Sequence, residues 1–363
     1  MNKKKYLLIG DHRTCENYGS IATGDQLIEL MKPRRLSVIP ITRMDQDYDY
    51  MPLTFKEFDD FADKVKKGLV LKMEKRAIDN SDNIIINCEG SLTHHTNASR
   101  CEGKYRARTR YMLFLAYYSA KFCGKEVSIV NHCVDPGNSS AEEMIKNVYP
   151  LLKRCWVRDN LSKVNLEKLG IKSAEFVPDA LYKFKNLNSN SLDRKYICIG
   201  DTATLGYAEW DVTNFFEDII TRLKKQGQKI IFVDGNMWKT TGIIEKLCDK
   251  LKVPWVHVDN TSWRELAEIF RQSKVFFSGR WHASILATIS GTPSILYGTD
   301  SHKTKALHND LGINGRFYEL NELPVYKDEI VQRLTSEKNK KEIDLVKFAN
   351  EQRSLLKKFY LDL

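Results

Sequence analysis

The sequence lacks any apolar run that approaches the roughly 20 residues needed to cross a bilayer. Its N-terminus, MNKKKYLLIGDHRT, begins with lysines, but the apolar stretch after them covers only Tyr6 to Ile9. That stretch is too short for a signal peptide. We therefore expect a cytoplasmic protein, and we interpret Lys5 to Gly10 as the first strand of a sheet.

Paired cysteines are also missing. The eight cysteines are scattered singly, with no CxxC pair and no zinc spacing. We interpret them as free thiols in a reducing cytoplasm. The sequence also has no cluster of carboxylates that could bind a metal ion in place of cysteines. We therefore expect neither a metal site nor a cofactor.

Acidic residues are fewer than basic residues. The chain has 57 Lys and Arg against 47 Asp and Glu, a formal net charge of +10. This excess favours acidic partners such as a phosphorylated substrate, a nucleic acid or an anionic membrane. No RNP-like motif, helix-turn-helix signal or aromatic-basic repeat favours nucleic acid. The basic cluster Arg100 to Arg110 suits a diphosphate or the inner face of the membrane, the alternative being a solvated charged face.

What the chain does have is a regular alternation of short β-rich runs with helical patterns, which is typical of parallel, doubly wound sheets. The alternation stops at the Asn- and Ser-rich run KNLNSNSLDRK and then restarts. We predict an α/β protein with two Rossmann-like domains, residues 1–185 and 195–325, that face a central cleft. By analogy with GT-B glycosyltransferases, the helices of residues 326–363 are expected to pack back toward the first domain.

The second domain contains the run VFFSGRWHASILATISGTPSILYG, followed by TDSHKTK. We interpret it as a strand, a turn at Ser278 and Gly279, a helix opened by Arg280 and His282, and a second strand. A cation and a titratable ring beside the free N–H groups of a helix N-terminus predict an anion site. The alternative is that the arginine caps a sheet edge and the histidine is structural.

Four polar turns follow strands in the first domain. Two are small-residue turns suited to an oxyanion, NYGS with Asn17, Gly19 and Ser20, and EGS with Gly90 and Ser91. For the first, a plain loop with Ser20 as helix N-cap is the alternative. The other two put His132 and Arg158 at strand ends. We expect Asp159 and Asp179 to be structural, one capping a helix and the other orienting Arg158.

In this order, the motifs resemble those of the polysaccharide pyruvyl transferase family from Tyr6 to Gly312. The most specific parts are Arg158 to Asp179 and Ser278 to Lys303. The chain departs from the family at Trp281, where a smaller aliphatic residue is usual, and at Cys88-Glu89, which replaces a glycine-rich turn.

The resemblance implies transfer of the enolpyruvyl unit of phosphoenolpyruvate onto two hydroxyls of a sugar, giving a cyclic ketal and phosphate. The sugar would belong to a cell-surface polysaccharide or to its nucleotide-linked or lipid-linked precursor. Arginine suits bidentate binding of the donor's phosphate and carboxylate, and histidine suits proton delivery near neutral pH. The implied catalytic residues are His282 as general acid, Arg280, and His132 as base or positioning group. The implied donor site is Arg158, Lys303, Ser278, Gly279 and His302, and the implied acceptor site is Asn17, Gly19, Ser20, Gly90 and Ser91.

Two other functions stay open. A GT-B glycosyltransferase could use the same cations to hold the diphosphate of a nucleotide sugar, and Trp281 and Cys88-Glu89 keep this reading open. A non-catalytic anion-binding protein is disfavoured because Arg158, Arg280, His282 and Lys303 occur together.

Overall fold

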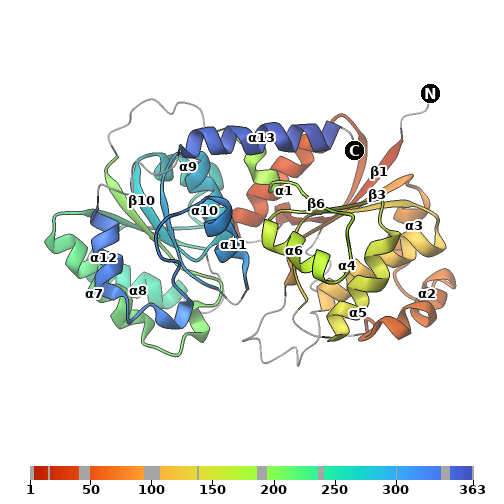
Figure 1. Ribbon diagram of the computed structural model, residues 1–363, viewed down its shortest axis with the longest axis horizontal. Helices are drawn as coiled ribbons and strands as arrows, with labels where there is room; N and C mark the ends of the chain where they lie inside the picture. The colour runs from red at the N-terminus through yellow and green to blue at the C-terminus, as the bar shows by residue number, and fades with distance from the viewer. Residues whose placement is uncertain are drawn as a thin grey trace. The chain divides into compact units, whose positions relative to one another are not determined.

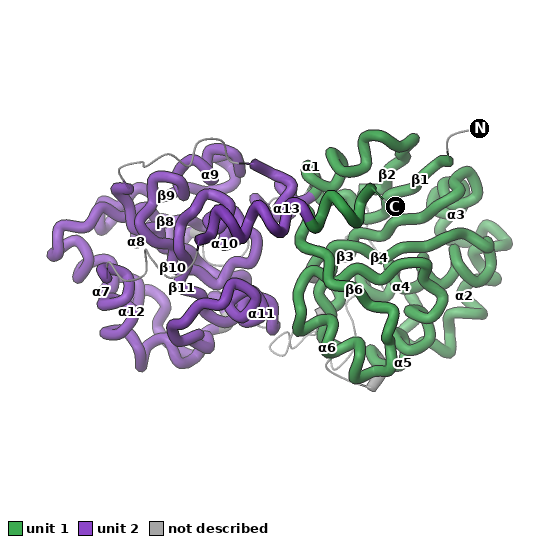
Figure 2. The backbone as a smooth tube through the Cα atoms, turned by 45° about the horizontal axis from the view of Figure 1, so that its top comes forward, with its two compact units in different colours: residues 1–15, 24–180, 355–363 green, residues 16–23, 181–354 purple. Residues whose placement is uncertain are grey.

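The computed structural model describes residues 4–14, 17–40, 50–93, 107–136, 139–185, 194–235, 241–299, 301–336 and 344–361. The chain divides into two compact units (Figure 2). Unit 1 consists of residues 1–15, 24–180 and 355–363, and unit 2 of residues 16–23 and 181–354. Each unit is built on its own parallel sheet.

The sheet of unit 1 has six parallel strands in the order β2-β1-β3-β4-β5-β6, of which Figure 1 labels β1, β3 and β6. They are β1 (Lys5–Asp11), β2 (Arg35–Pro40), β3 (Asn83–Thr93), β4 (Glu126–Asp135), β5 (Arg154–Val157) and β6 (Ala174–Phe176). The helices in this part of the chain are α1 (Tyr18–Met31), α2 (Phe58–Lys66), α3 (Lys72–Asp79), α4 (Ala107–Tyr117), α5 (Ser139–Val148) and α6 (Asn160–Lys168).

Both faces of this sheet are buried, because alternate side chains of its central strands enter different cores. Ile84 and Ile86 of β3 pack with the aromatic side chains of α2 and α4. Ile85, between them, packs on the other face with residues of α1 and the C-terminal helix. A run of isoleucines is therefore what a strand covered on both faces requires.

Unit 2 has five parallel strands in the order β11-β10-β7-β8-β9. They are β7 (Tyr196–Gly200), β8 (Lys229–Asp234), β9 (Trp255–His257), β10 (Ser273–Ser278) and β11 (Ser294–Leu296). Its helices are α7 (Val212–Lys225), α8 (Thr241–Leu251), α9 (Trp263–Arg271), α10 (Trp281–Ile289), α11 (Lys303–Asp310) and α12 (Lys327–Thr335). Local caps fix some helix starts: Asp211 accepts from the Asn214 N–H, and Ser262 with Glu265 forms a capping box.

Both ends of the chain contribute to both units. Helix α1 begins in unit 2 and continues in unit 1, and α13 (Leu345–Leu361) does the same. In unit 1, Phe359 and Tyr360 of α13 pack against Trp156 with ring centroids 5.6 and 5.2 Å away. Helix α12 instead packs on α7 within unit 2, where Asp328 pairs with Arg222 at 2.7 Å.

The expected α/β class with doubly wound parallel sheets is confirmed. Two expected strand ends are wrong. β3 runs through Gly90 and Ser91, which were expected to form a turn, and β4 runs past His132, which was expected at a strand end, to Asp135. A register shift in each strand accommodates the irregular residues, so the strand continues. The shift lies between Glu89 and Leu92 in β3 and between Ile129 and His132 in β4. Most of the expected linker lies outside the described residues.

Candidate active site

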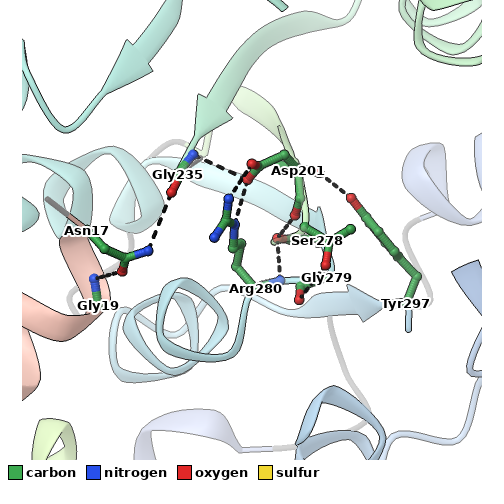
Figure 3. A network of polar contacts seen from close by, with 10 residues as sticks. Asn17, Gly19, Asp201, Gly235, Ser278, Gly279, Arg280 and Tyr297 are labelled. Carbon is green, nitrogen blue, oxygen red and sulfur yellow. Dashed lines mark hydrogen bonds and ion pairs between the residues drawn. The ribbon is translucent and has the colours of Figure 1, made fainter. Parts of the chain in front are cut away.

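The carboxyl ends of β10, β7 and β8, three neighbouring strands of unit 2, bring several polar groups together (Figure 3). Asp201 follows β7, Gly235 follows β8, and Arg280 follows β10 after a short turn. This edge is where open parallel sheets bind ligands.

The turn after β10 is held by its own hydrogen bonds. The Ser278 hydroxyl donates to the Asp201 carbonyl at 3.1 Å and accepts from the Arg280 N–H at 3.0 Å. The Gly279 N–H donates to the same carbonyl at 3.2 Å. A Cβ on Gly279 would lie 2.6 Å from Cβ of Thr202, so only glycine fits. The structure thus gives Ser278 and Gly279 a shaping role, and their direct contact with a donor stays a prediction.

Arg280 is clamped by Asp201. Its Nε and Nη2 donate to the two carboxylate oxygens at 2.9 and 2.5 Å, and the Asp201 side chain is fully buried. Burial alone would lower the pKa of Arg280, but Asp201 and Asp234 raise it overall, so the guanidinium is a permanent cation. An arginine has five N–H donors. Those on the side away from Asp201 can hold a phosphate or carboxylate, and the side chain is 15% exposed.

His282 lies in the first turn of α10 and packs against the first turn of α1. A Cβ on Gly19 would come within 2.3 Å of the His282 Nδ1. Asn17 caps α1 by accepting from the N–H groups of Gly19 and Ser20 at 2.9 and 3.3 Å. Its amide also donates to the Gly235 carbonyl at 3.4 Å. Two helix N-termini, with their positive dipole ends, therefore adjoin one another in unit 2.

These contacts place Asn17, Gly19 and Ser20 in the same unit as Arg280 and His282, although the sequence assigned them to the first domain. Asn17, rather than Ser20, is the residue whose side chain caps the helix. His302 and Lys303 lie at the start of α11, which packs against α10 and β11. Both are partly exposed.

Arg158 belongs to unit 1 and is a buried residue, with 1% of its side chain exposed. It pairs with Asp179 at 2.8 Å, and its Nε lies 3.1 Å from the Cys133 sulfur. Burial would lower its pKa, but Cys133, Asp179 and Glu89 raise it overall. The structural role expected for Asp179 is confirmed. That of Asp159 is confirmed too, because its carboxylate accepts from the Ser162 N–H at 2.7 Å and caps α6.

His132 does not have the surroundings expected of a catalytic base. Its ring is fully buried, and its Nε2 lies 3.0 Å from the Tyr149 hydroxyl. Burial lowers its pKa to about 3. A side chain with no exposed surface does not reach a sugar hydroxyl in this conformation, so the structure supports a packing role for His132.

Gly90 and Ser91 lie within β3 and not at a helix N-terminus. The residue before them, Glu89, has a left-handed backbone with φ of 45°, a conformation that disfavours side chains. Its side chain makes a buried polar contact with His12, whose Nδ1 lies 3.3 Å from the Glu89 Oε2.

The sequence reading missed Asp201, His12 and Glu89 as parts of polar sites. Asp201 had a usable signal, because it is an acidic residue directly after the apolar strand β7. His12 and Glu89 had none, since their pairing joins segments 77 residues apart. Among the residues that the structure describes, no three His, Cys, Asp or Glu side chains are grouped to hold a metal ion.

Comparison with solved structures shows the fold. A UDP-GlcNAc 2-epimerase from Methanocaldococcus jannaschii is 14% identical and covers 96% of this chain and 99% of its own, with a TM-score of 0.55. A glycosyltransferase from Rickettsia africae is 12% identical over 100% of this chain and 98% of its own, with a TM-score of 0.54. A UDP-N-acetylglucosamine 2-epimerase from Rickettsia bellii is 12% identical, covering 99% and 96%, with a TM-score of 0.56. These support an α/β fold of the GT-B type.

The sequence finds no significant match among curated proteins. The family model for polysaccharide pyruvyl transferase, in contrast, matches residues 17–301. The match begins at the Asn17 cap and includes Asp201, Arg280 and His282. The chain therefore belongs to the polysaccharide pyruvyl transferase family and is a transferase that modifies polysaccharides.

Proposed function

We propose that the protein transfers the enolpyruvyl group of phosphoenolpyruvate onto two hydroxyls of a sugar, forming a cyclic ketal and releasing phosphate. The observation that carries this proposal is the placement of Arg280 and His282 at the N-terminus of α10. A permanent cation held by a buried carboxylate, a titratable ring two residues later and a helix dipole meet at one sheet edge.

The donor is a small dianion or trianion, and unit 2 supplies groups suited to it. The free side of the Arg280 guanidinium and the first-turn N–H groups of α10 would hold the phosphate or the carboxylate. Lys303, at the start of α11, would add a second cation. Because these cations neutralise the donor, the reaction as proposed needs no metal and no cofactor.

His282 would act as the general acid. It would give a proton to the methylene carbon, which becomes a methyl group, and leave an oxocarbenium-like carbon that a sugar hydroxyl attacks. The carbon–oxygen bond to phosphate then breaks, and the second hydroxyl closes the ketal. Of the two hydroxyl protons, one replaces the proton that His282 gave and the other leaves with phosphate.

The acceptor would bind beside the first turn of α1. His282 packs against Gly19 there, and Ser20 of the same turn lies on a partly exposed surface, where its hydroxyl would contact the sugar. The sugar would be carried by a nucleotide, a lipid or the polymer itself. The reaction would take place in the cytoplasm, and the free cysteines at 88, 123, 133, 155, 198 and 248 support that placement.

The test is a thermal shift with phosphoenolpyruvate and with a panel of UDP-, GDP- and CMP-sugars, combined with an assay of phosphate release. A ligand that binds only the native state raises the melting temperature in line with RT ln(1 + [L]/Kd). We expect phosphoenolpyruvate to stabilise the wild type. Arg280→Lys should abolish the shift, because lysine cannot bind Asp201 and the donor through one planar fork.

His282→Asn should keep the donor shift and slow phosphate release about 10²- to 10⁴-fold. Arg271→Lys is the matched control, since Arg271 on α9 is also paired with a carboxylate, Glu268 at 2.7 Å from its Nε. It should leave both readings unchanged. If only a nucleotide sugar stabilises the wild type, pyruvyl transfer is wrong and the protein is a glycosyltransferase.

A further inference from the structure

The loop between α2 and α3 in unit 1 and the first turn of α3 each expose a large apolar side chain. Leu69 is 66% exposed and Met73 is 60% exposed. Lys66, Lys67, Lys72 and Arg76 surround them in sequence and are exposed as well. We call these six residues the basic apolar surface. Helices α2 and α3, which carry it, pack against one another (Figure 1).

The backbone holds the two apolar side chains outward. Gly68 has φ of 68°, and Leu71 has φ of 50°, which is costly for a residue with a side chain. Leu71 is 7% exposed and belongs to the core of unit 1, so it anchors the loop. Leu69 lies two positions before this anchor in the loop, and Met73 lies two positions after it in the first turn of α3, so ordered backbone displays both side chains.

The charges around them are mostly cationic. Residues 66–76 contain five Lys and Arg and a single carboxylate, Glu74, which accepts a hydrogen bond from the Tyr111 hydroxyl at 3.1 Å. Lys66 pairs with Asp63 at 3.0 Å. For Lys67, Lys72 and Arg76 no ion pair is found within the described ranges of the chain. Lys72 and Arg76 are four residues apart on α3, on the same side as Met73.

We propose that the basic apolar surface docks the protein on a membrane of anionic lipids. Aliphatic side chains flanked by lysines are what a peripheral membrane contact requires, because the apolar groups enter the interface while the cations bind lipid headgroups. A nucleic-acid partner fits less well, since the surface offers no aromatic ring for base stacking. Within the described ranges, no helix combines the length and apolar character of a membrane span, so the contact would be peripheral.

This inference does not depend on the reaction. It would bring the enzyme to the surface where a lipid-linked sugar is carried, but the docking can be measured with no substrate at all. A failure of pyruvyl transfer would therefore leave the docking result unaffected, and the reverse also holds.

The experiment is co-sedimentation of the full chain with vesicles of phosphatidylcholine alone and of phosphatidylcholine with phosphatidylglycerol. We expect binding to the anionic vesicles only, weakened by high salt. Lys67→Gln with Lys72→Gln should weaken it about fivefold for each lysine. Leu69→Ser with Met73→Ser should weaken it at least tenfold at unchanged charge.

The matched control is Val325→Ser with Lys357→Gln and Lys358→Gln, which removes a 78% exposed side chain and two exposed lysines elsewhere. It should bind as the wild type does, and circular dichroism should show all variants folded. Equal binding to both vesicle types, or wild-type binding by the Leu69/Met73 variant, would overturn the proposal. So would retention by a short DNA duplex with no binding to vesicles, which would assign the surface to nucleic acid.

Discussion

Arg280 and Asp201 are 79 residues apart and yet are joined by two hydrogen bonds in the candidate site. The carboxylate fixes the plane of the guanidinium, so the free N–H donors have one direction before any ligand arrives. Preorganisation of this kind lowers the entropy that binding costs. At the scale of single residues, the site therefore depends as much on the partner of the arginine as on the arginine.

Gly19 offers a direct test of the contact between the two helix N-termini. Gly19→Ala would put a methyl group 2.2 Å from Cβ of His282, so the ring must move. We expect a large loss of kcat and a destabilisation of about 1–3 kcal/mol. Phosphate release and thermal unfolding measure the two effects.

The control for this change is Gly242→Ala on α8, where a Cβ meets nothing within 4 Å. It should keep full activity and gain up to about 1 kcal/mol, since alanine is the better helix former. Equal activity for the two variants would show that the ring of His282 does not need its present position.

His132 should make unit 1 sensitive to acid. Its pKa is lowered to about 3 by burial, while in the unfolded chain it would titrate near its ordinary value of about 6.5. Below pH 6.5 His132 binds a proton in the unfolded state but not in the native state. The free energy of unfolding therefore falls as pH falls from about 6.5 toward 3. Between pH 7 and 5 this histidine should cost about 2 kcal/mol.

Urea unfolding followed by hydrogen exchange of the backbone amides of unit 1 measures this loss, because five of the six tryptophans belong to unit 2 and fluorescence would not isolate unit 1. His132→Gln should be less stable at pH 7 but should lose about 2 kcal/mol less than the wild type on going to pH 5. The same pH dependence in both proteins would mean that another group takes up the proton.

At the scale of secondary-structure elements, β3 and β4 share an irregularity at their carboxyl ends. Glu89 and Asn131 both have positive φ, 45° and 54°, next to a register shift in each strand. Side-chain contacts hold both residues there. Glu89 pairs with His12, and the amide of Asn131 donates to Asn87 at 3.2 Å. Bulges of this kind commonly lie near functional sites, where they redirect side chains.

The energetic cost of the left-handed backbone at Glu89 can be measured separately from the loss of its contact with His12 by comparing two variants. Glu89→Ala and Glu89→Gly both remove the buried contact with His12, so that loss cancels in the comparison. Only glycine relieves the left-handed backbone, so Glu89→Gly should be about 1 kcal/mol more stable than Glu89→Ala. Urea unfolding of unit 1 gives the difference.

Glu167, exposed on α6, is the matched position. There the order should reverse, with alanine about 1 kcal/mol more stable than glycine. If alanine is also the more stable residue at position 89, the left-handed conformation of Glu89 is not a source of strain.

At the scale of the whole molecule, neither unit is a continuous stretch of chain. Unit 1 is completed by residues 355–363, of which Leu356 and Tyr360 are buried with Trp156. Unit 2 is completed by residues 16–23, which carry the Asn17 cap. Both units therefore need segments that are remote in sequence.

Removal of residues 355–363 should destabilise unit 1 strongly. The loss of Leu356 and Tyr360 from the core should cost about 4 kcal/mol or more, and Trp156 should become exposed. A lower urea midpoint of unit 1 and faster hydrogen exchange of the amides around Trp156 would report this. Removal of residues 362 and 363 alone is the control and should change neither reading; an unchanged midpoint in the longer truncation would show that unit 1 folds without α13.

The sequence by itself was sufficient to predict the secondary-structure elements and the motif that contains Arg280 and His282. Lys5 to Gly10 was expected as the first strand and is part of β1, and the strand expected before the turn at Ser278 and Gly279 is β10. The start of α10 at Arg280 and the cap of α6 at Asp159 were also expected. These features depend on local apolar runs, turns and caps, which a few neighbouring residues determine.

Only the tertiary structure decided which groups share a site. Asp201 reaches Arg280, and Gly19 reaches His282, because neighbouring strands and helix starts bring distant segments together. The same packing buries Arg158 and His132, although their positions at strand ends were compatible with exposed, reactive roles. Strand order, register and burial arise from contacts between residues far apart in the sequence, and local sequence patterns do not predict those contacts.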